Sequence, residues 1–216
     1  MSYSLDTVIL DTKSNGKPKS AIVLCHGYAG NGKNIALLAN YWRDFLPDTI
    51  FLCPNAPDSS TTKKGSFQWF DPNEKNREKT LSNAIKSEAK LNKFIDEVIE
   101  KNSLSDDKLI IGGFSQGCMI TLQAGIKRKN KIKSIIGYSG KIIDMDYLDR
   151  NLNSKPNIYL FHGDKDEIVL PEFLNESKKF LQERNFNIKT KMFKECDHRI
   201  PREGVNLGLD FIKNFF

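Results

Sequence analysis

The run Leu109-Ile110-Ile111-Gly112-Gly113-Phe114-Ser115-Gln116-Gly117 decides the fold of this chain. An apolar strand pattern leads into Gly-x-Ser-x-Gly, and residues 118–127 then have the pattern of a helix. A serine on a sharp turn between a strand and a helix is held where a substrate can reach it. The strand and the helix nearly touch at such a turn, so small residues are needed there, and Gly113 and Gly117 provide them. This context predicts that Ser115 is a nucleophile.

A nucleophilic serine needs a histidine as base and a carboxylate that orients the histidine. The chain has three histidines, which are His26, His162 and His198. In enzymes with this type of turn the acid and then the base follow the serine along the chain, which excludes His26. We expect His26 and His162 to be partly buried residues at strand ends that bond to backbone groups.

The choice of the base decides which carboxylate can orient it. If His162 were the base, the acid would come from a polar connection with no strand before it, at Asp144, Asp146 or Asp149. If His198 is the base, Asp164 or Asp166 directly follows an apolar strand, where a turn projects side chains over the end of the sheet. We therefore assign Ser115 as nucleophile, Asp166 as the orienting acid and His198 as base.

Strand and helix patterns alternate along the chain, which is typical of a mainly parallel sheet covered by helices on both faces. The expected strands are Thr7–Leu10, Ala21–Cys25, Thr49–Cys53, Leu109–Gly112, Ser134–Tyr138, Asn157–Phe161 and Lys189–Phe193. The expected helices are Asn34–Asp44, Leu81–Lys101, Gln116–Lys127, Pro171–Asn185 and Arg202–Phe216. We expect the first strand to pair antiparallel at an edge. The length and the lack of a linker or repeat predict one domain over residues 1–216.

Four segments of the chain, spread over most of its length, resemble the phospholipase/carboxylesterase family of α/β-hydrolases, which includes the acyl-protein thioesterases. They are Leu24-Cys25-His26-Gly27-Tyr28-Ala29-Gly30, Trp69-Phe70-Asp71, Gly112-Gly113-Phe114-Ser115-Gln116-Gly117 and His162-Gly163-Asp164-Lys165-Asp166. The resemblance implies an α/β-hydrolase fold. In the family's His-Gly-x-x-Asp pattern the last residue is the catalytic acid, which here is Asp166 and not Asp164.

The resemblance also implies an oxyanion hole formed by the backbone N–H groups of Tyr28 and Gln116. Fixed N–H dipoles of this kind stabilise the negative charge that develops on a carbonyl oxygen during attack by serine. The chain departs from the family in two places. Glu167 follows the acid where the family usually has Pro, and Cys196-Asp197 precedes His198 where the family often has Gly.

Bulk properties limit the classes of partner. The net charge is +6, but basic and acidic residues are interspersed and no basic-aromatic groove pattern occurs, so we expect no nucleic-acid partner. We see neither a signal-peptide pattern at the start nor an apolar run that could span a membrane, and expect a cytoplasmic protein. The spacing of the four cysteines fits neither a zinc site nor a disulfide framework, which indicates free thiols.

The segment from Pro54 to Asp71 is long, has few regular patterns and contains aromatic residues. Trp69 and Phe70 are either part of an acyl pocket or lid, or anchors packed into the body of the protein. Leu170, just past the predicted acid, is a further candidate for a pocket wall.

The sequence as a whole predicts a serine hydrolase that cleaves carboxylic esters through an acyl-enzyme, without a metal or a cofactor. Candidate substrates are small-molecule esters, lysophospholipids and acylated proteins, and the protein is expected to be a monomer or a homodimer. One alternative is a dienelactone-hydrolase-like enzyme, although those enzymes have Cys in place of Ser115. Another is a catalytically silent interaction module on the same scaffold.

Overall fold

A computed structural model of the protein describes residues 2–215. It contains a seven-stranded sheet in the order β1-β3-β2-β6-β7-β8-β9 and a small two-stranded sheet of β4 and β5. The strands are β1 (Thr7–Leu10), β2 (Ser20–Cys25), β3 (Thr49–Pro54), β4 (Asp58–Ser59), β5 (Phe67–Gln68), β6 (Leu109–Phe114), β7 (Ser134–Tyr138), β8 (Asn157–Gly163) and β9 (Ile188–Phe193).

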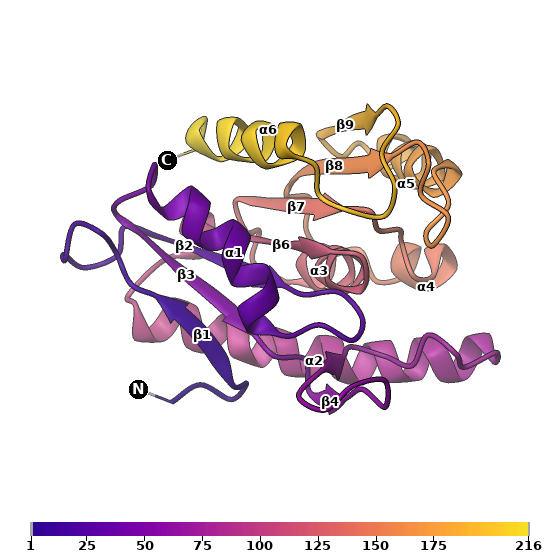
Figure 1. The fold of residues 1–216 in the computed structure, drawn as a ribbon, viewed down its shortest axis with the longest axis horizontal. Coiled ribbons are helices and arrows are strands. Elements are labelled where there is room, and N and C mark those ends of the chain that lie inside the picture. Colours follow the sequence, from indigo (N-terminus) through magenta and orange to yellow (C-terminus); the bar gives the residue numbers. More distant parts are fainter. Residues whose placement is uncertain (1, 216) are drawn as a thin grey trace.

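Six α-helices within residues 2–215 cover the large sheet on both faces (Figure 1). They are α1 (Gly32–Arg43), α2 (Arg77–Lys101), α3 (Gln116–Lys127), α4 (Met145–Asp149), α5 (Glu172–Glu183) and α6 (Arg202–Lys213). Helices α1 and α6 pack on one face, and α2, α3, α4 and α5 contribute to the hydrophobic core on the other. The result is the three-layered α/β arrangement of an α/β-hydrolase.

The central strands are apolar on both sides because both of their faces are buried. In β2, Val23 packs into the core beneath α2 and α3, whereas Ile22 and Leu24 pack into the core beneath α1 and α6. Every residue of β2 is buried. This is the pattern of strands in the middle of a parallel sheet, where successive side chains point to opposite faces.

The register of the parallel strands brings their carboxyl ends to one edge of the sheet. Cys25 at the end of β2 is paired with Gly113 of β6, and Phe114 of β6 is paired with Tyr138 of β7. Tyr138 is in turn paired with Phe161 of β8. The loops that follow these strands therefore meet at the same edge, which is where open α/β sheets bind their ligands.

The predicted elements of the large sheet are confirmed, with differences of a few residues at their ends. Strand β1 pairs antiparallel with β3 at the edge, as expected. Helix α2 begins at Arg77 and not at Leu81, because the Asn76 side chain accepts a hydrogen bond from Lys79 N and caps the helix one turn earlier. The expected end of the last helix at Phe216 lies outside the described residues.

The sequence analysis did not predict α4, β4 or β5, all of which are short. Helix α4 has five residues, and the β4–β5 pair has two residues in each strand. No helix in residues 2–215 is long and apolar enough to cross a membrane.

The four cysteines are buried and unpaired in the part of the chain that the structure describes, in agreement with the prediction of free thiols. Burial raises the pKa of Cys53 and of Cys118 to about 12. Thiols with such a pKa are protonated at neutral pH and are poor nucleophiles.

Candidate active site

Ser115 lies on the turn between β6 and α3 in a strained conformation. Its φ is 53° and its ψ is −120°, in the positive-φ region that residues other than glycine rarely adopt. Its N–H donates to Tyr138 O at 2.8 Å, and its own carbonyl accepts from Met119 N in α3. The Ser115 side chain does not cap the helix, so its hydroxyl is free for other contacts. This is the geometry of a nucleophile elbow.

The two glycines of the motif allow β6 and α3 to approach β2. A Cβ atom built on Gly113 would lie 2.5 Å from Cys25 O, and one built on Gly117 would lie 2.1 Å from the same oxygen. Both distances are far below van der Waals contact. A side chain at either position would therefore displace the elbow or the end of β2.

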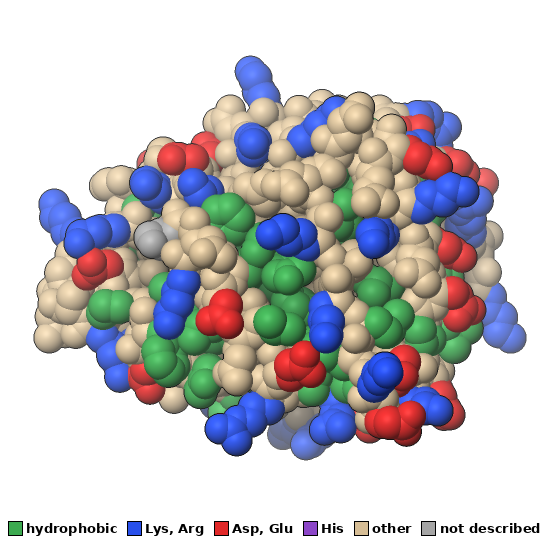
Figure 2. Space-filling model, turned by 90° about the horizontal axis from the view of Figure 1, so that it is seen from above, with side chains coloured by type: hydrophobic (Ala, Val, Ile, Leu, Met, Phe, Trp, Pro, Cys, Tyr) green, Lys and Arg blue, Asp and Glu red, His purple; other side chains and the backbone are tan. Residues whose placement is uncertain are grey.

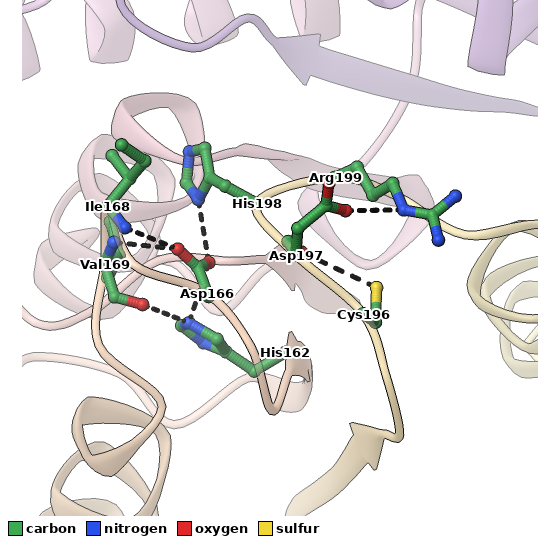
Figure 3. Close-up of polar contacts among 8 residues, drawn as sticks. All are labelled: His162, Asp166, Ile168, Val169, Cys196, Asp197, His198 and Arg199. Atoms are coloured by element: carbon green, nitrogen blue, oxygen red, sulfur yellow. Dashed lines mark hydrogen bonds and ion pairs between the residues drawn. The ribbon is translucent and has the colours of Figure 1, made fainter.

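Asp166, in the loop between β8 and α5, has a buried and fully hydrogen-bonded carboxylate (Figure 3). Its Oδ1 accepts from Ile168 N at 3.0 Å and from Val169 N at 2.9 Å. Its Oδ2 lies 2.7 Å from Nδ1 of His198. Burial opposes ionisation, but the hydrogen bonds from His198 and the two amides outweigh it and lower the pKa of Asp166.

His198 lies in the loop between β9 and α6, and its Nδ1 points at Asp166 (Figure 3). The His198 ring also packs against Phe114, the neighbour of Ser115, with 4.7 Å between the two ring centroids. In residues 2–215 no hydrogen bond joins Ser115 to His198. The structure thus brings Asp166 and His198 into direct contact and places His198 against the elbow residue Phe114.

A second imidazole also contacts Asp166. His162, at the end of β8, has its Nε2 2.7 Å from Val169 O and 3.1 Å from Asp166 Oδ2. A carbonyl and a carboxylate both accept, so Nε2 carries the proton, and Nδ1 is a buried atom without a partner among the described residues. Burial lowers the pKa of His162, which favours this neutral form.

His26 is buried just after the end of β2, and both of its ring nitrogens form hydrogen bonds with backbone groups. Nε2 accepts from Ala56 N at 2.9 Å, so the proton is on Nδ1, which donates to Gly27 O at 2.7 Å. Burial lowers the pKa of His26. The expectation that His26 and His162 bond to backbone groups is confirmed, and each is only 1% exposed, more buried than expected.

The predicted oxyanion residues come from two separate segments of the chain. Gln116 is the first residue of α3, and its N–H is one of the helix N–H groups that have no acceptor within the helix. Tyr28 lies in the connection from β2 to α1, and its hydroxyl is 2.7 Å from that of Thr62. Both residues border the same cavity as Ser115.

Two open cavities meet at Tyr28. The first, which we call the Ser115 hollow, has a volume of about 350 Å³ and is lined by Tyr28, Phe70, Pro72, Thr80, Ser115, Gln116, Met119, Lys141, Ile143, Ile168, Val169 and Phe173. The second, the His198 hollow, is lined by His26, Gly27, Tyr28, Gly30, Asn34, Ile35, Phe114, His198, Arg199 and Ile200. Ser115 and His198 thus line two neighbouring hollows that share Tyr28.

Of the three candidate pocket residues, one lines the Ser115 hollow and two do not. Phe70 lines the Ser115 hollow, as proposed. Trp69 does not, because it is fully buried and its indole N–H donates to His26 O at 3.0 Å. Leu170 is not among the lining residues either and is 43% exposed, whereas its neighbours Ile168 and Val169 line the hollow. Trp69 is thus an anchor of its segment, the second of the two roles considered from the sequence.

The Gln116 side chain explains why Trp69 is held in place. Its Oε1 accepts from Trp69 N at 3.2 Å, and its Nε2 donates to Phe70 O at 2.8 Å. Ser87 of α2 donates its hydroxyl proton to Trp69 O. The start of α3 and the middle of α2 therefore fix the backbone that presents Phe70 to the hollow.

Lys141 is a residue of the Ser115 hollow that the sequence analysis missed. It follows β7, the neighbour of β6 in the sheet. Residues just after the carboxyl end of a strand that neighbours the nucleophile strand are expected at the site, and this signal was present in the sequence.

Comparison with known proteins gives one consistent result. The family profile described as Phospholipase/Carboxylesterase matches residues 9–216. The chain belongs to the phospholipase/carboxylesterase family. It is a serine hydrolase of the carboxylesterase/phospholipase type, and the family assignment made from the sequence is confirmed.

Individual relatives agree with this assignment. Acyl-protein thioesterase 1 of Kluyveromyces lactis is 28% identical over 191 residues, which cover 82% of each chain. Acyl-protein thioesterase 1 of Aspergillus fumigatus is 30% identical, over 77% of this chain and 75% of the relative. The crystal structure of esterase PE8 superimposes with a TM-score of 0.93 at 29% identity, covering 98% of this chain and 99% of that one.

Proposed function

We propose that Ser115, His198 and Asp166 form the catalytic triad of this hydrolase. Ser115 Oγ attacks the carbonyl carbon of an ester or thioester while His198 Nε2 takes its proton. Asp166 accepts from His198 Nδ1 and stabilises the imidazolium that forms. His198 then gives the proton to the leaving group, and water releases the acid from the acyl-enzyme by the same steps.

The N–H groups of Tyr28 and Gln116 bind the oxyanion of each tetrahedral intermediate in this proposal. Charge develops on the carbonyl oxygen only during the reaction, so fixed donors at this place lower the barrier more than they strengthen substrate binding. Each such donor is typically worth about 3 kcal/mol of barrier.

The observation that carries the proposal is the contact between His198 Nδ1 and Asp166 Oδ2 at 2.7 Å. It fixes the tautomer of His198, because a carboxylate accepts and Nδ1 must then carry the proton. Nε2 is left as the base. The strained conformation of Ser115 at the same edge of the sheet supports its role as the nucleophile.

The walls of the Ser115 hollow are mainly apolar and support a proposal for the substrate class. We propose carboxylic esters with an apolar acyl chain as substrates, with lysophospholipids and S-acylated proteins as the natural candidates. Relatives named acyl-protein thioesterase support the last of these. The reaction needs neither a metal nor a cofactor in this proposal.

We further propose that residues 1–216 act as one cytoplasmic domain, as a monomer or homodimer, with no nucleic-acid partner and no stable insertion into membranes. Figure 2 supports the absence of a nucleic-acid site on the face that it shows, where lysine and arginine side chains are interspersed with acidic and hydrophobic ones. A nucleic-acid site would place basic residues in a continuous patch or stripe.

A fluorophosphonate probe, which labels activated serines, tests the proposal. The wild-type protein is expected to be labelled and to hydrolyse aryl esters, and Ser115→Ala is expected to lose labelling and activity on the order of 10⁴-fold or more. Circular dichroism and the melting temperature report whether the variant is folded. Labelling that persists in Ser115→Ala would move the nucleophile elsewhere. A folded wild-type protein that is never labelled would favour an interaction module.

A further inference from the structure

Lys141 is a basic residue placed beside the nucleophile. It lies in the connection from β7 to α4, directly after Gly140. Gly140 packs against the elbow, since a Cβ atom built on it would be 3.1 Å from Ser115 O and 2.5 Å from Cys118 Sγ. Both Ser115 and Lys141 line the Ser115 hollow. The backbone contact thus ties the position of Lys141 to that of the nucleophile.

The ammonium group of Lys141 has no anionic partner in the described structure. Among residues 2–215 it takes part in no ion pair, and its Nζ lies over the ring of Phe173, 4.0 Å from the centroid. Burial lowers the pKa of Lys141, and the charge of Glu176 on α5 opposes this. An aromatic ring stabilises a half-buried ammonium less than a carboxylate would, so Lys141 can still bind an anion.

The rest of the wall around Lys141 is mainly apolar. The apolar residues that line the hollow with it include Met119, Ile143, Ile168, Val169 and Phe173. A hydrophobic wall lowers the local dielectric and strengthens the attraction between Lys141 and any anion that enters. The hollow thus combines walls that suit methylene groups with one cation.

The position of the base decides which part of the substrate meets Lys141. The leaving group takes its proton from His198, and His198 lines the other hollow. The alcohol or thiol therefore departs through the His198 hollow, and the acyl group occupies the Ser115 hollow. A negative charge that reaches Lys141 must then be carried by the acyl group.

We propose that this hydrolase prefers acyl groups that end in a carboxylate, and that Lys141 binds that carboxylate. The substrates are half-esters or half-thioesters of dicarboxylic acids, whose methylene groups lie along the apolar wall. The inference rests on the proposed function, since it places the acyl group relative to Ser115 and His198. No new bond is formed or broken at Lys141, and the hydrolysis itself is unchanged.

Matched pairs of aryl esters test this preference. Each pair has the same number of acyl carbons and differs only at the terminal carbon, for example hexanoate against the half-ester of adipic acid, and pentanoate against the half-ester of glutaric acid. We expect the wild-type protein to hydrolyse the charged ester of at least one pair with a kcat/KM about tenfold higher than the neutral one. The preference should shrink as salt is added, because salt screens the attraction.

Variants at Lys141 separate charge from packing. Lys141→Met keeps the stem against Phe173 and removes the charge, so the ratio of kcat/KM between the charged and the neutral ester of each pair should fall to about one. Lys141→Arg should retain most of the preference, and Lys141→Glu should reverse it. Lys129→Met is the matched control, because Lys129 is an exposed residue of the α3–β7 connection that does not line the hollow, and this variant should keep the wild-type preference.

A second series places the charge on the leaving group, with acetyl esters of phenol against those of 4-hydroxybenzoate. Lys141→Met should leave the kcat/KM ratio of these two acetyl esters unchanged. If Lys141→Met changes this ratio but not the ratios of the acyl pairs, the placement of the acyl group is overturned. Rapid hydrolysis of neutral esters with no charge preference in any pair would reject the role of Lys141 and leave the proposed function intact. No hydrolysis or probe labelling at all would reject the proposed function.

Discussion

His162 Nε2 lies 3.1 Å from the Oδ2 atom of Asp166, the same oxygen that lies 2.7 Å from His198 Nδ1. The Asp166 carboxylate therefore has two imidazoles beside it, and His198 is the one that packs against Phe114, the neighbour of Ser115. The backbone amides of Ile168 and Val169 hold the other carboxylate oxygen. We therefore expect His162 to be a positioning residue that helps to fix the rotation of the Asp166 carboxylate beside His198.

The role of His162 can be tested by removing its N–H donor. His162→Leu should lower kcat by about tenfold with little change in KM, which is the size of one hydrogen bond to a charged group. His162→Gln can place an N–H near the same position and should retain most of the activity. Melting temperatures of both variants separate this effect from loss of fold. Equal activity in His162→Leu and the wild type would show that the two amides alone hold Asp166.

The two candidate acids should respond very differently to loss of charge. Asp166→Asn should lower kcat/KM by several orders of magnitude, because an amide cannot stabilise the imidazolium on His198. Asp164→Asn should cost little, since within residues 2–215 the one hydrogen bond to the Asp164 side chain comes from Cys196 N, at 3.3 Å, near the start of the loop that carries His198. The measurement is kcat/KM of both variants on one aryl ester. A larger loss in Asp164→Asn would assign the acid two residues upstream.

The triad candidates could be predicted from the sequence because local patterns point to Ser115 and His198, and the resemblance to the family's His-Gly-x-x-Asp pattern favours Asp166 over Asp164. Ser115 is set by the strand–glycine–helix run, and Asp166 and His198 follow the last two strands of the sheet. Parallel strands bring such loops to one edge whatever the details of packing.

The burial of Trp69 could not be predicted from a local pattern. An irregular segment has no periodicity that distinguishes a buried face from an exposed one. Trp69 is buried by contacts with Gln116, His26 and Ser87, which lie 18 to 47 residues away in the chain. Only the packing of α2 and α3 against the sheet brings these groups together.

The free energy of unfolding should fall as the solution is made acidic, because His26 and His162 are buried in neutral form. The pKa of an unfolded histidine is about 6.5, and burial lowers both pKa values in the folded protein. Between the folded and unfolded values the unfolded chain binds more protons, so stability is lost as the pH falls below about 6.5. Each histidine contributes at most about 1.4 kcal/mol per pH unit in this window.

Urea denaturation at pH 7.5, 6.5 and 5.5 measures this effect. His26→Gln can still accept from Ala56 N–H through its amide oxygen but does not titrate, so its unfolding free energy should change less between pH 6.5 and 5.5. In the wild type a second proton on His26 must break the bond from Ala56. A wild-type stability that is constant over this range would contradict the burial of both imidazoles as neutral groups.

Neutral acyl esters of rising length should define the size of the Ser115 hollow. Each methylene group that is buried adds up to about 0.8 kcal/mol to transition-state binding, so kcat/KM should rise from acetyl to about hexanoyl or octanoyl. Ile143→Ala removes part of the wall and enlarges the hollow, so the acyl length with the highest kcat/KM should increase. Trp69→Phe should leave the optimum in place and lower the melting temperature, because the ring loses its hydrogen bond to His26 O. A shift of the optimum in Trp69→Phe but not in Ile143→Ala would return Trp69 to the pocket wall, whereas a profile that falls from acetyl to butyryl would indicate a small acyl site.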